Sequence, residues 1–413
     1  MNVSHKFMLL TALALSIGCQ SASDMVSPAN SGIGTPGADL RVSAPFARQT
    51  TDFAFDAFRR INTTEGNKNV FVSPLSLHIA LGMLLNGADS QTAADIQKTL
   101  KLDAQTLTEA NATYKSLLAG LPALDPKVTL KIANSAWYRN DFAIEPAYLT
   151  VLRDNFSATA TGLNFTDPLA KNQINQWASE QTNGKIKTVI QEIKPEHVLF
   201  LLNAIYFNGD WKTRFDMART VDSPFYLNNG GQKTVKMMRL DAPMRRAFRP
   251  SYSAVDLPYA MGKYAMTVML PAENSTANGL INTITPADWI QLQQDMTEAK
   301  TDFGLPRFSF SYEIGLNDVL TQMGMGLAFT NGANLTRISR TNRLKVDFVK
   351  QNTFVAVDET GTEAAAVTSI GVGTTSLGPM PMLCNRPFVV VIHEKTTGAI
   401  LFMGKVTDPT LGM

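Results

Sequence analysis

The side chains that most often carry catalytic or metal chemistry are few in this sequence and widely spaced. The chain of 413 residues has 4 histidines and 2 cysteines, namely His5, His78, His197, His393, Cys19 and Cys384. A Ser–His–Asp site would have to use His78, His197 or His393, and none of them has a nucleophile motif such as G-x-S-x-G beside it. An H-E-x-x-H motif, a Walker loop and a Cys/His cluster are also missing. We therefore predict that the protein is not an enzyme and that it needs no metal or cofactor.

Composition and charge exclude further classes of function. Lysine and arginine total 37 and aspartate and glutamate 35, which gives a net charge of +2 with the charges interspersed. Because no basic stripe stands out, nucleic-acid binding has no support. Hydrophobic residues make up 45% of the chain, so it can bury a core. Two cysteines so far apart cannot staple a fold of this size, and we expect Cys19 and Cys384 not to pair.

The amino terminus has the layout of a secretory signal. Lys6 gives residues 1–18 a positive start, and the apolar run 7–17 is too short to cross a bilayer as a helix. The small residue before Cys19 resembles the end of a bacterial lipoprotein signal, in which this cysteine receives the lipid, although Ser16 stands where that pattern prefers Leu, Val or Ile. In the alternative, an ordinary signal is cleaved near Ala22 and Cys19 is discarded. Both interpretations predict export, either to the bacterial cell envelope with a lipid anchor or to the extracellular space.

Residues 19–45 follow the signal and are rich in Ser, Ala, Gly and Pro. Such a composition cannot bury a core, so we predict a flexible tether that leads into a folded body at 46–413.

The folded body has the pattern of one α+β domain. Ser73 is a good N-cap, Pro74 suits a first helical position and Gly87 is a good stop, so a helix is predicted between them. That helix is apolar nearly all round, which predicts burial on every side. Further helices are predicted near 90–100 and 169–182, and strand patterns occur at 128–132, 198–207, 253–258, 264–270, 303–312, 344–357, 387–393 and 399–405. Helices come first and strands dominate later, which favours an α+β fold over alternating βαβ units.

The stretch 355–388 is unusual because no charged residue occurs between Ala364 and Asn385. As a strand, one of its faces would be small or apolar, with Thr362, Ala364, Ala366, Thr368, Ile370 and Val372. Glycines and prolines at 371–381 are loop signals and argue against a membrane span. Three interpretations stay open, namely a surface loop of low complexity, a buried strand followed by a loop, and a strand-competent loop that is exposed in one state and inserted in another.

Six motifs in order make the sequence resemble the serpins across 46–413. They are NVFVSPLSL at 69–77, INQWASEQTNGKI at 174–186, LNAIYFNGDW at 202–211, LPRF at 305–308, FVAVDETGTEAAA at 354–366, and RPF at 386–388 with LFMGK at 401–405. The resemblance implies the serpin fold, in which N-terminal helices pack around a large mixed β-sheet with smaller sheets and an exposed reactive-centre loop, here about 359–386. It also implies a suicide inhibitor of serine proteases. In this family the cleaved loop inserts into the main sheet and traps the protease as an acyl-enzyme.

The resemblance assigns roles to particular residues. The hinge, which enters the sheet first, is Glu359, Gly361, Thr362, Glu363, Ala364, Ala365 and Ala366. These residues are mostly small, as a packed sheet requires. Trp211 matches the breach, where insertion begins. Ser73, Ser76 and Asn203 match the shutter, a polar cluster under the middle of the sheet, and Gln351 stands where the family often has His.

The scissile bond depends on how the loop is counted. Counting forward from Gly361 gives Thr375–Ser376, which we prefer because hinge length governs insertion. Counting back from Pro387 gives Ser376–Leu377. A small residue before the bond indicates an elastase-like or subtilisin-like target rather than a trypsin-like enzyme.

Three hypotheses about function follow. The first is an inhibitory serpin that acts as a monomer, with a target serine protease as its covalent partner and with membrane contact only through lipid on Cys19. The second is a non-inhibitory serpin-fold binding protein or chaperone. The third is an exported hydrolase that uses the scattered histidines His197 or His393. No Lys/Arg cluster comparable to the heparin-binding helix of some family members is present.

Overall fold

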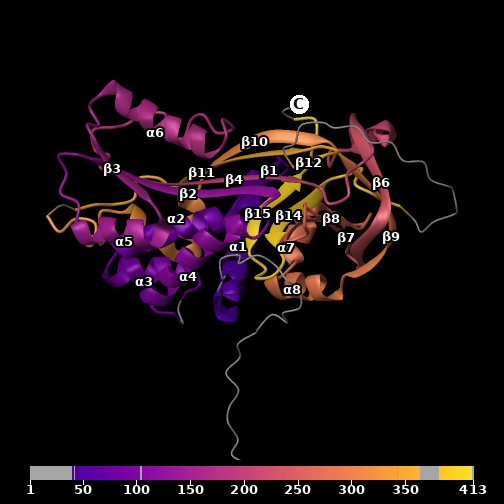
Figure 1. The fold of residues 1–413 in the computed structure, drawn as a ribbon. Coiled ribbons are helices and arrows are strands. Elements are labelled where there is room, and N and C mark those ends of the chain that lie inside the picture. The colour runs from indigo at the N-terminus through magenta and orange to yellow at the C-terminus, as the bar shows by residue number, and fades with distance from the viewer. Residues whose placement is uncertain (1–39, 41, 103–104, 342, 363–380, 412–413) are drawn as a thin grey trace, which may run out of the picture. The chain divides into compact units, whose positions relative to one another are not determined.

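The computed structural model describes residues 40, 42–102, 105–341, 343–362 and 381–411, which fold as an α+β unit with two β-sheets (Figure 1). The helices are α1 (Ala44–Glu65), α2 (Pro74–Gly87), α3 (Ser90–Thr99), α4 (Leu107–Gly120), α5 (Pro146–Phe156), α6 (Pro168–Gln181), α7 (Ala277–Thr283), α8 (Pro286–Asp295) and α9 (Asn317–Leu320). The predicted fold class is confirmed, with most helices before most strands.

One sheet has six strands in the order β10 (Phe308–Gly315), β11 (Lys350–Val357), β12 (Gly361–Thr362), β4 (Leu199–Asp210), β2 (Val128–Arg139) and β3 (Thr159–Leu163). It is a mixed sheet, because β2 and β3 are parallel and the other pairs are antiparallel. Figure 1 shows α6 on one face of this sheet and α2 and α5 on the other. Its middle strands are therefore covered on both sides.

The other sheet has the order β1 (Val70–Val72), β15 (Ile400–Val406), β14 (Phe388–Glu394), β8 (Tyr264–Pro271), β7 (Tyr252–Pro258), β6 (Gln232–Phe248), β9 (Thr297–Pro306) and β13 (Met382–Leu383), and β5 (Val221–Tyr226) also pairs with β6. Strands β8, β14 and β15 are buried along their whole length, so this sheet supplies much of the core.

Helix α2 forms as its sequence predicts. The Ser73 side chain accepts a hydrogen bond from the Ser76 N–H, and Pro74 occupies the first turn. Nearly every residue of the helix is buried, as its all-round apolar composition predicts. Helix α1 begins at Ala44, two residues before the expected start of the folded body, because Ser43 caps it.

Several predicted strands have different bounds in the structure, and the run 128–132, for example, continues to Arg139 as β2. The run 303–312 is split at Arg307 into β9, which pairs with β6, and β10, which pairs with β11. The run 344–357 becomes a strand only at Lys350. Before it, the Val346 N–H donates to the Ala328 carbonyl, so the backbone there is committed to a loop contact.

Candidate functional site

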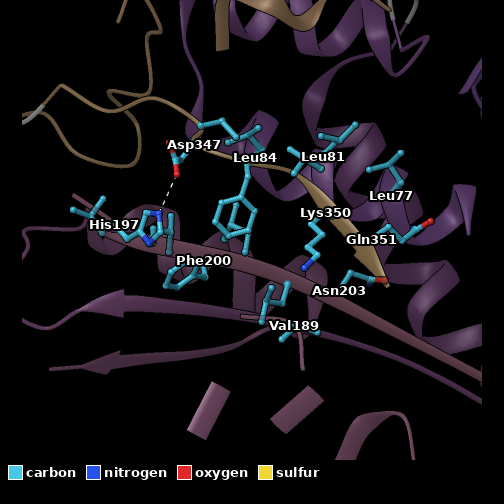
Figure 2. Close-up of a pocket in the computed structure, with 18 of the residues that line it drawn as sticks. Leu77, Leu81, Leu84, Val189, His197, Phe200, Asn203, Asp347, Lys350 and Gln351 are labelled. Atoms are coloured by element: carbon cyan, nitrogen blue, oxygen red, sulfur yellow. Dashed lines mark hydrogen bonds and ion pairs between the residues drawn. The ribbon is translucent and has the colours of Figure 1, made fainter. Parts of the chain in front are cut away.

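A gap lies in the six-stranded sheet between β4 and β11. Among the described residues, the two residues of β12 pair with both strands, through Gly361–Asp210, Thr362–Gly209 and Thr362–Val357. Beyond β12, no ladder pairs β4 with β11 among the residues that the structure describes. A cavity of about 510 Å³ lies there instead, between α2 and the loop that follows α6 (Figure 2). The sheet thus has an open strand position that is filled only at one end.

Trp211 holds the filled end of the gap together. Its indole Nε1–H donates to the Asp358 carbonyl at 2.9 Å, and its backbone N–H donates to the Thr360 carbonyl at 2.8 Å. The indole stacks on the Tyr259 ring, with centroids 4.5 Å apart and an interplanar angle of 19°. Only 3% of Trp211 is exposed, so these contacts are made in a dry environment.

The turn into β12 is built for close approach to β4. The Asp358 carboxylate accepts from the Thr360 N–H at 2.8 Å and from the Gly361 N–H at 3.2 Å. A Cβ at position 361 would overlap the Gly209 carbonyl and lie 2.7 Å from the Asp210 Cα, so this position requires glycine. Thr362 then forms a 2.6 Å hydrogen bond between its hydroxyl and that of Tyr259.

Glu359 anchors the same turn to the neighbouring strands. Its carboxylate accepts from Arg307 Nε at 2.8 and 2.7 Å and forms an ion pair with Arg307 Nη2 at 2.6 Å. The Thr220 hydroxyl also donates to it. Burial alone would raise the pKa of Glu359, but the hydrogen bonds from Arg307 and Thr220 outweigh it and hold the pKa below its ordinary value. The charged form is therefore the one that the fold stabilises.

A buried polar network lies under the middle of the gap. The Gln351 amide accepts from the Ser73 N–H and donates to the Ser73 carbonyl, both at 2.9 Å. The Ser76 hydroxyl donates to Asn203 Oδ1, and Asn203 Nδ2 donates to Asn134 Oδ1 at 2.6 Å. The network therefore connects β11, α2, β4 and β2 across the gap.

Comparison with known proteins supports one family. The model of the family described as Serpin (serine protease inhibitor) matches residues 48–409. The leukocyte elastase inhibitor of Xenopus laevis is 32% identical over 374 residues, which cover 87% of this chain and 98% of that protein. The chain is a member of the serpin family.

Solved serpin structures share its fold. The native state of the thermophilic serpin tengpin superposes with a TM-score of 0.82 at 30% identity, covering 89% of this chain and 95% of tengpin. Human thyroxine-binding globulin in complex with its ligand also gives a TM-score of 0.82, at 27% identity over 88% of this chain and 98% of that protein. Serpins are protease inhibitors rather than enzymes, so the expectation that the chain is not an enzyme is confirmed by its family.

The sequence singled out several residues by their resemblance to serpins. Those that lie within the described part of the chain meet in and around the gap. Glu359, Gly361 and Thr362 meet Trp211 at one end of the gap. Ser73, Ser76, Asn203 and Gln351 form the network in its middle. The remaining hinge positions 363–366, the candidate bonds at 375–377 and Cys19 lie outside the described residues.

Three residues of the site had not been singled out. Asn134, Tyr259 and Arg307 contact Asn203, Thr362 and Glu359, respectively. The Asn134–Asn203 contact follows from the register of β2 with β4, which pairs these two residues directly, and a single sequence does not reveal that register.

The scattered histidines have structural partners. Burial lowers the pKa of His78 to about 4, and its ring lies between Phe46 and Phe53. His393 Nε2 lies 3.0 Å from the Thr267 hydroxyl inside the core. Cys384 is buried as a free thiol, and burial raises its pKa. Among the described residues, no group of three or more His, Cys, Asp or Glu is placed to hold a metal, and no helix is long and apolar enough to cross a membrane.

Proposed function

We propose that this serpin inhibits a serine protease as a suicide substrate and that the gap between β4 and β11 receives its cleaved reactive-centre loop. The observation that carries the proposal is that Gly361 and Thr362 already occupy the first positions of the gap as β12. The edges of β4 and β11 further along the gap can accept an added strand, whose backbone groups would pair with both sides.

The covalent step follows from the loop sequence. The protease serine oxygen attacks the carbonyl carbon of Thr375, and the Thr375–Ser376 peptide bond breaks. The new amino group at Ser376 takes the proton, and an ester joins Thr375 to the protease. The free hinge then enters the gap and carries the ester with it. Distortion of the protease active site prevents water from cleaving the ester.

The hinge chemistry supports insertion. Position 361 requires glycine, and the Thr362 hydroxyl already has a buried partner in Tyr259. The next residues are Glu363 and three alanines, which need little volume in a packed sheet. A hinge of this kind favours inhibition over a purely binding role.

The residue before the scissile bond selects the target class. Thr375 suits a small primary pocket, so the proposed target is an elastase-like or subtilisin-like protease. The name of the Xenopus relative, leukocyte elastase inhibitor, agrees with this class.

The amino-terminal features complete the proposal. Residues 1–18 direct export, lipid on Cys19 anchors the mature monomer to a bacterial cell envelope, and residues 19–45 act as a tether. A Cys19→Ser variant is then expected in the medium, whereas the parent protein fractionates with membranes. Equal fractionation of the two would contradict the lipid anchor.

The test of inhibition mixes the purified protein with pancreatic elastase and with subtilisin. Denaturing gels and intact mass spectrometry are expected to show a covalent complex at the summed mass. The mass of the released carboxy-terminal fragment then identifies Thr375–Ser376 or Ser376–Leu377 as the cleaved bond. A Thr362→Arg variant is the matched control, because a long charged side chain cannot replace the buried threonine beside Tyr259. It should be cleaved without forming the complex.

If the parent protein is cleaved without forming a complex, the melting temperature of the cleaved form is measured next. A large rise in melting temperature would show that the loop inserts and that another protease is the target. No rise would contradict the inhibitory function and favour a binding role, as the name of thyroxine-binding globulin indicates for that relative.

A further inference from the structure

A second contact bridges the gap at the end opposite β12. His197 precedes β4 and Phe200 lies within it, whereas Asp347 and Phe348 belong to the segment that leads into β11. His197 Nε2 lies 3.0 Å from Asp347 Oδ2, as the dashed line in Figure 2 shows. The Phe348 ring lies 5.8 Å from that of His197 and 6.0 Å from that of Phe200, between centroids. We call these four residues the clasp.

Both sides of the clasp are held in place by backbone contacts. On the β4 side, His197 Nδ1 accepts from the Lys194 N–H at 3.0 Å, and the Arg139 N–H donates to the Val198 carbonyl at 3.0 Å. On the other side, the Asn317 side chain donates to the Asp347 carbonyl at 2.8 Å and accepts from the Val349 N–H at 2.7 Å. The clasp therefore joins two supported edges of the sheet rather than two free loops.

A strand cannot pass the clasp while the clasp is closed. Neighbouring strands lie about 4.8 Å apart, so edges that flank an added strand are separated by roughly 10 Å. The side chains of His197 and Asp347 meet at 3.0 Å, between Nε2 and Oδ2, in the space between these two edges. Insertion at this level requires the contact to break or the edges to part.

The register of β12 shows how many loop residues insert before the loop reaches the clasp. Gly361 pairs with Asp210 and Thr362 with Gly209, so each further residue of an inserted loop pairs with the preceding residue of β4. Continued without a bulge, this register places position 371 opposite Phe200 and position 374 opposite His197. Most of the loop can therefore enter above the clasp, and only the last residues before Thr375 must open it.

We propose that the clasp controls the final stage of loop insertion, the stage that moves the attached protease to the far end of the sheet. This inference rests on the proposed function. A closed clasp slows full insertion and gives water more time to release the protease. The four side chains thus set the balance between trapping the protease and losing the inhibitor as a spent substrate.

Two synthetic peptides test the clasp without any protease. One has the sequence of residues 363–375 and reaches the clasp, and the other has the sequence 363–369 and ends opposite Leu202 in the same register. Their rates of binding to the full-length protein are measured by native gel and by tryptophan fluorescence, to which Trp177 in the cavity lining contributes. Asp347→Ala removes the clasp contact at a side chain that is 43% exposed, so the fold should persist.

The matched control is Glu313→Ala. Glu313 is 46% exposed and pairs with Lys350 at 2.7 Å, but both residues lie on the same side of the gap. Asp347→Ala should speed binding of the long peptide about fivefold, the effect of losing one partly exposed charged contact. It should leave the short peptide unchanged, and Glu313→Ala should change neither rate.

The possible outcomes separate the clasp from the proposed function. If the parent protein binds the long peptide and Asp347→Ala binds it no faster than Glu313→Ala does, the proposed role of the clasp is overturned. The proposed loop insertion would still stand. Equal acceleration of both peptides would overturn the clasp as well, because a general loosening of the sheet has no length dependence. If neither peptide binds and loop cleavage does not raise the melting temperature, both proposals fail. A Phe348→Leu variant, which keeps apolar volume but removes the ring contacts, should accelerate only the long peptide.

Discussion

Replacing Gln351 by leucine would test whether the polar network in the gap stabilises the intact serpin. The substitution keeps similar volume but removes two hydrogen bonds to the Ser73 backbone, each 2.9 Å long. The Ser73 carbonyl keeps a partner in the Leu77 N–H at 3.1 Å, whereas the Ser73 N–H loses its acceptor in a fully buried position. The substitution therefore leaves one buried donor, the Ser73 N–H, without a hydrogen-bond partner.

The expected loss can be worked from these contacts. A buried donor left without a partner costs about 2 kcal/mol, and the second bond contributes about 1 kcal/mol. The free energy of unfolding should fall by about 3 kcal/mol, less a few tenths gained from the apolar side chain. The control is Asn352→Ala at the next position of β11, where a half-buried side chain donates to Glu313 at 2.6 Å. Asn352→Ala should lower the free energy of unfolding by about 0.5 kcal/mol.

The assay is urea unfolding of the uncleaved variants, followed by tryptophan fluorescence. Gln351→Leu should lower the midpoint clearly with an unchanged slope, because the surface exposed on unfolding stays the same. Equal midpoints for Gln351→Leu and Asn352→Ala would refute the reasoning, since the buried Ser73 N–H would then have found another acceptor at no cost.

Three further predictions concern the hinge and a buried histidine. Gly361→Ala should push β12 away from β4 and cost about 1–3 kcal/mol, measured as a lower urea midpoint and faster hydrogen exchange in β12. Gly315→Ala is the control. A Cβ added at this strand position would meet no neighbouring side chain or strand within 4 Å, so the loss of stability should be far smaller. Because the pKa of Glu359 is lowered in the folded state, its charged form stabilises the fold at pH values above the ordinary glutamate pKa. This stability is lost as the pH falls through the lowered pKa, so Glu359→Gln should flatten the acid side of a stability–pH curve. An unchanged acid side would show that the Arg307 pair adds nothing. The pKa of His78 falls from 6.5 to about 4, so stability should decline by up to about 3 kcal/mol as pH falls across that window, and a melt series with His78→Phe should lack the decline.

The helices and the site class could be predicted because their signals are local. Ser73, Pro74 and Gly87 punctuate α2 within fifteen residues of sequence, and the structure follows them. Six short motifs in order indicated the family, and the resemblance assigned Trp211 to the breach, where insertion begins, and Gln351 to the shutter under the middle of the sheet. Such signals do not depend on which strands are neighbours.

The remaining parts of the site depend on contacts that one sequence does not encode locally. The start of β11 was predicted too early because 344–349 has an apolar strand pattern, yet its backbone bonds to a loop at Ala328. Arg307 was seen only as part of a strand motif, and its pairing with Glu359 requires β10 to lie beside β11. The clasp needs His197 and Asp347, which are 150 positions apart, to meet across the gap. Long-range register and loop hydrogen bonding are thus the features that a single sequence leaves undetermined.

The two residues of β12 have a consequence for the kinetics of the proposed insertion. Adding a strand resembles closing a zipper, in which the first pair is the costly nucleus because it orders the chain before cooperative contacts form. Here Gly361 and Thr362 are already paired with β4 in the intact protein, so that nucleus exists before any protease arrives. Insertion after cleavage is then a propagation reaction, and its rate should respond more to residues further along the gap than to the strength of the first pair.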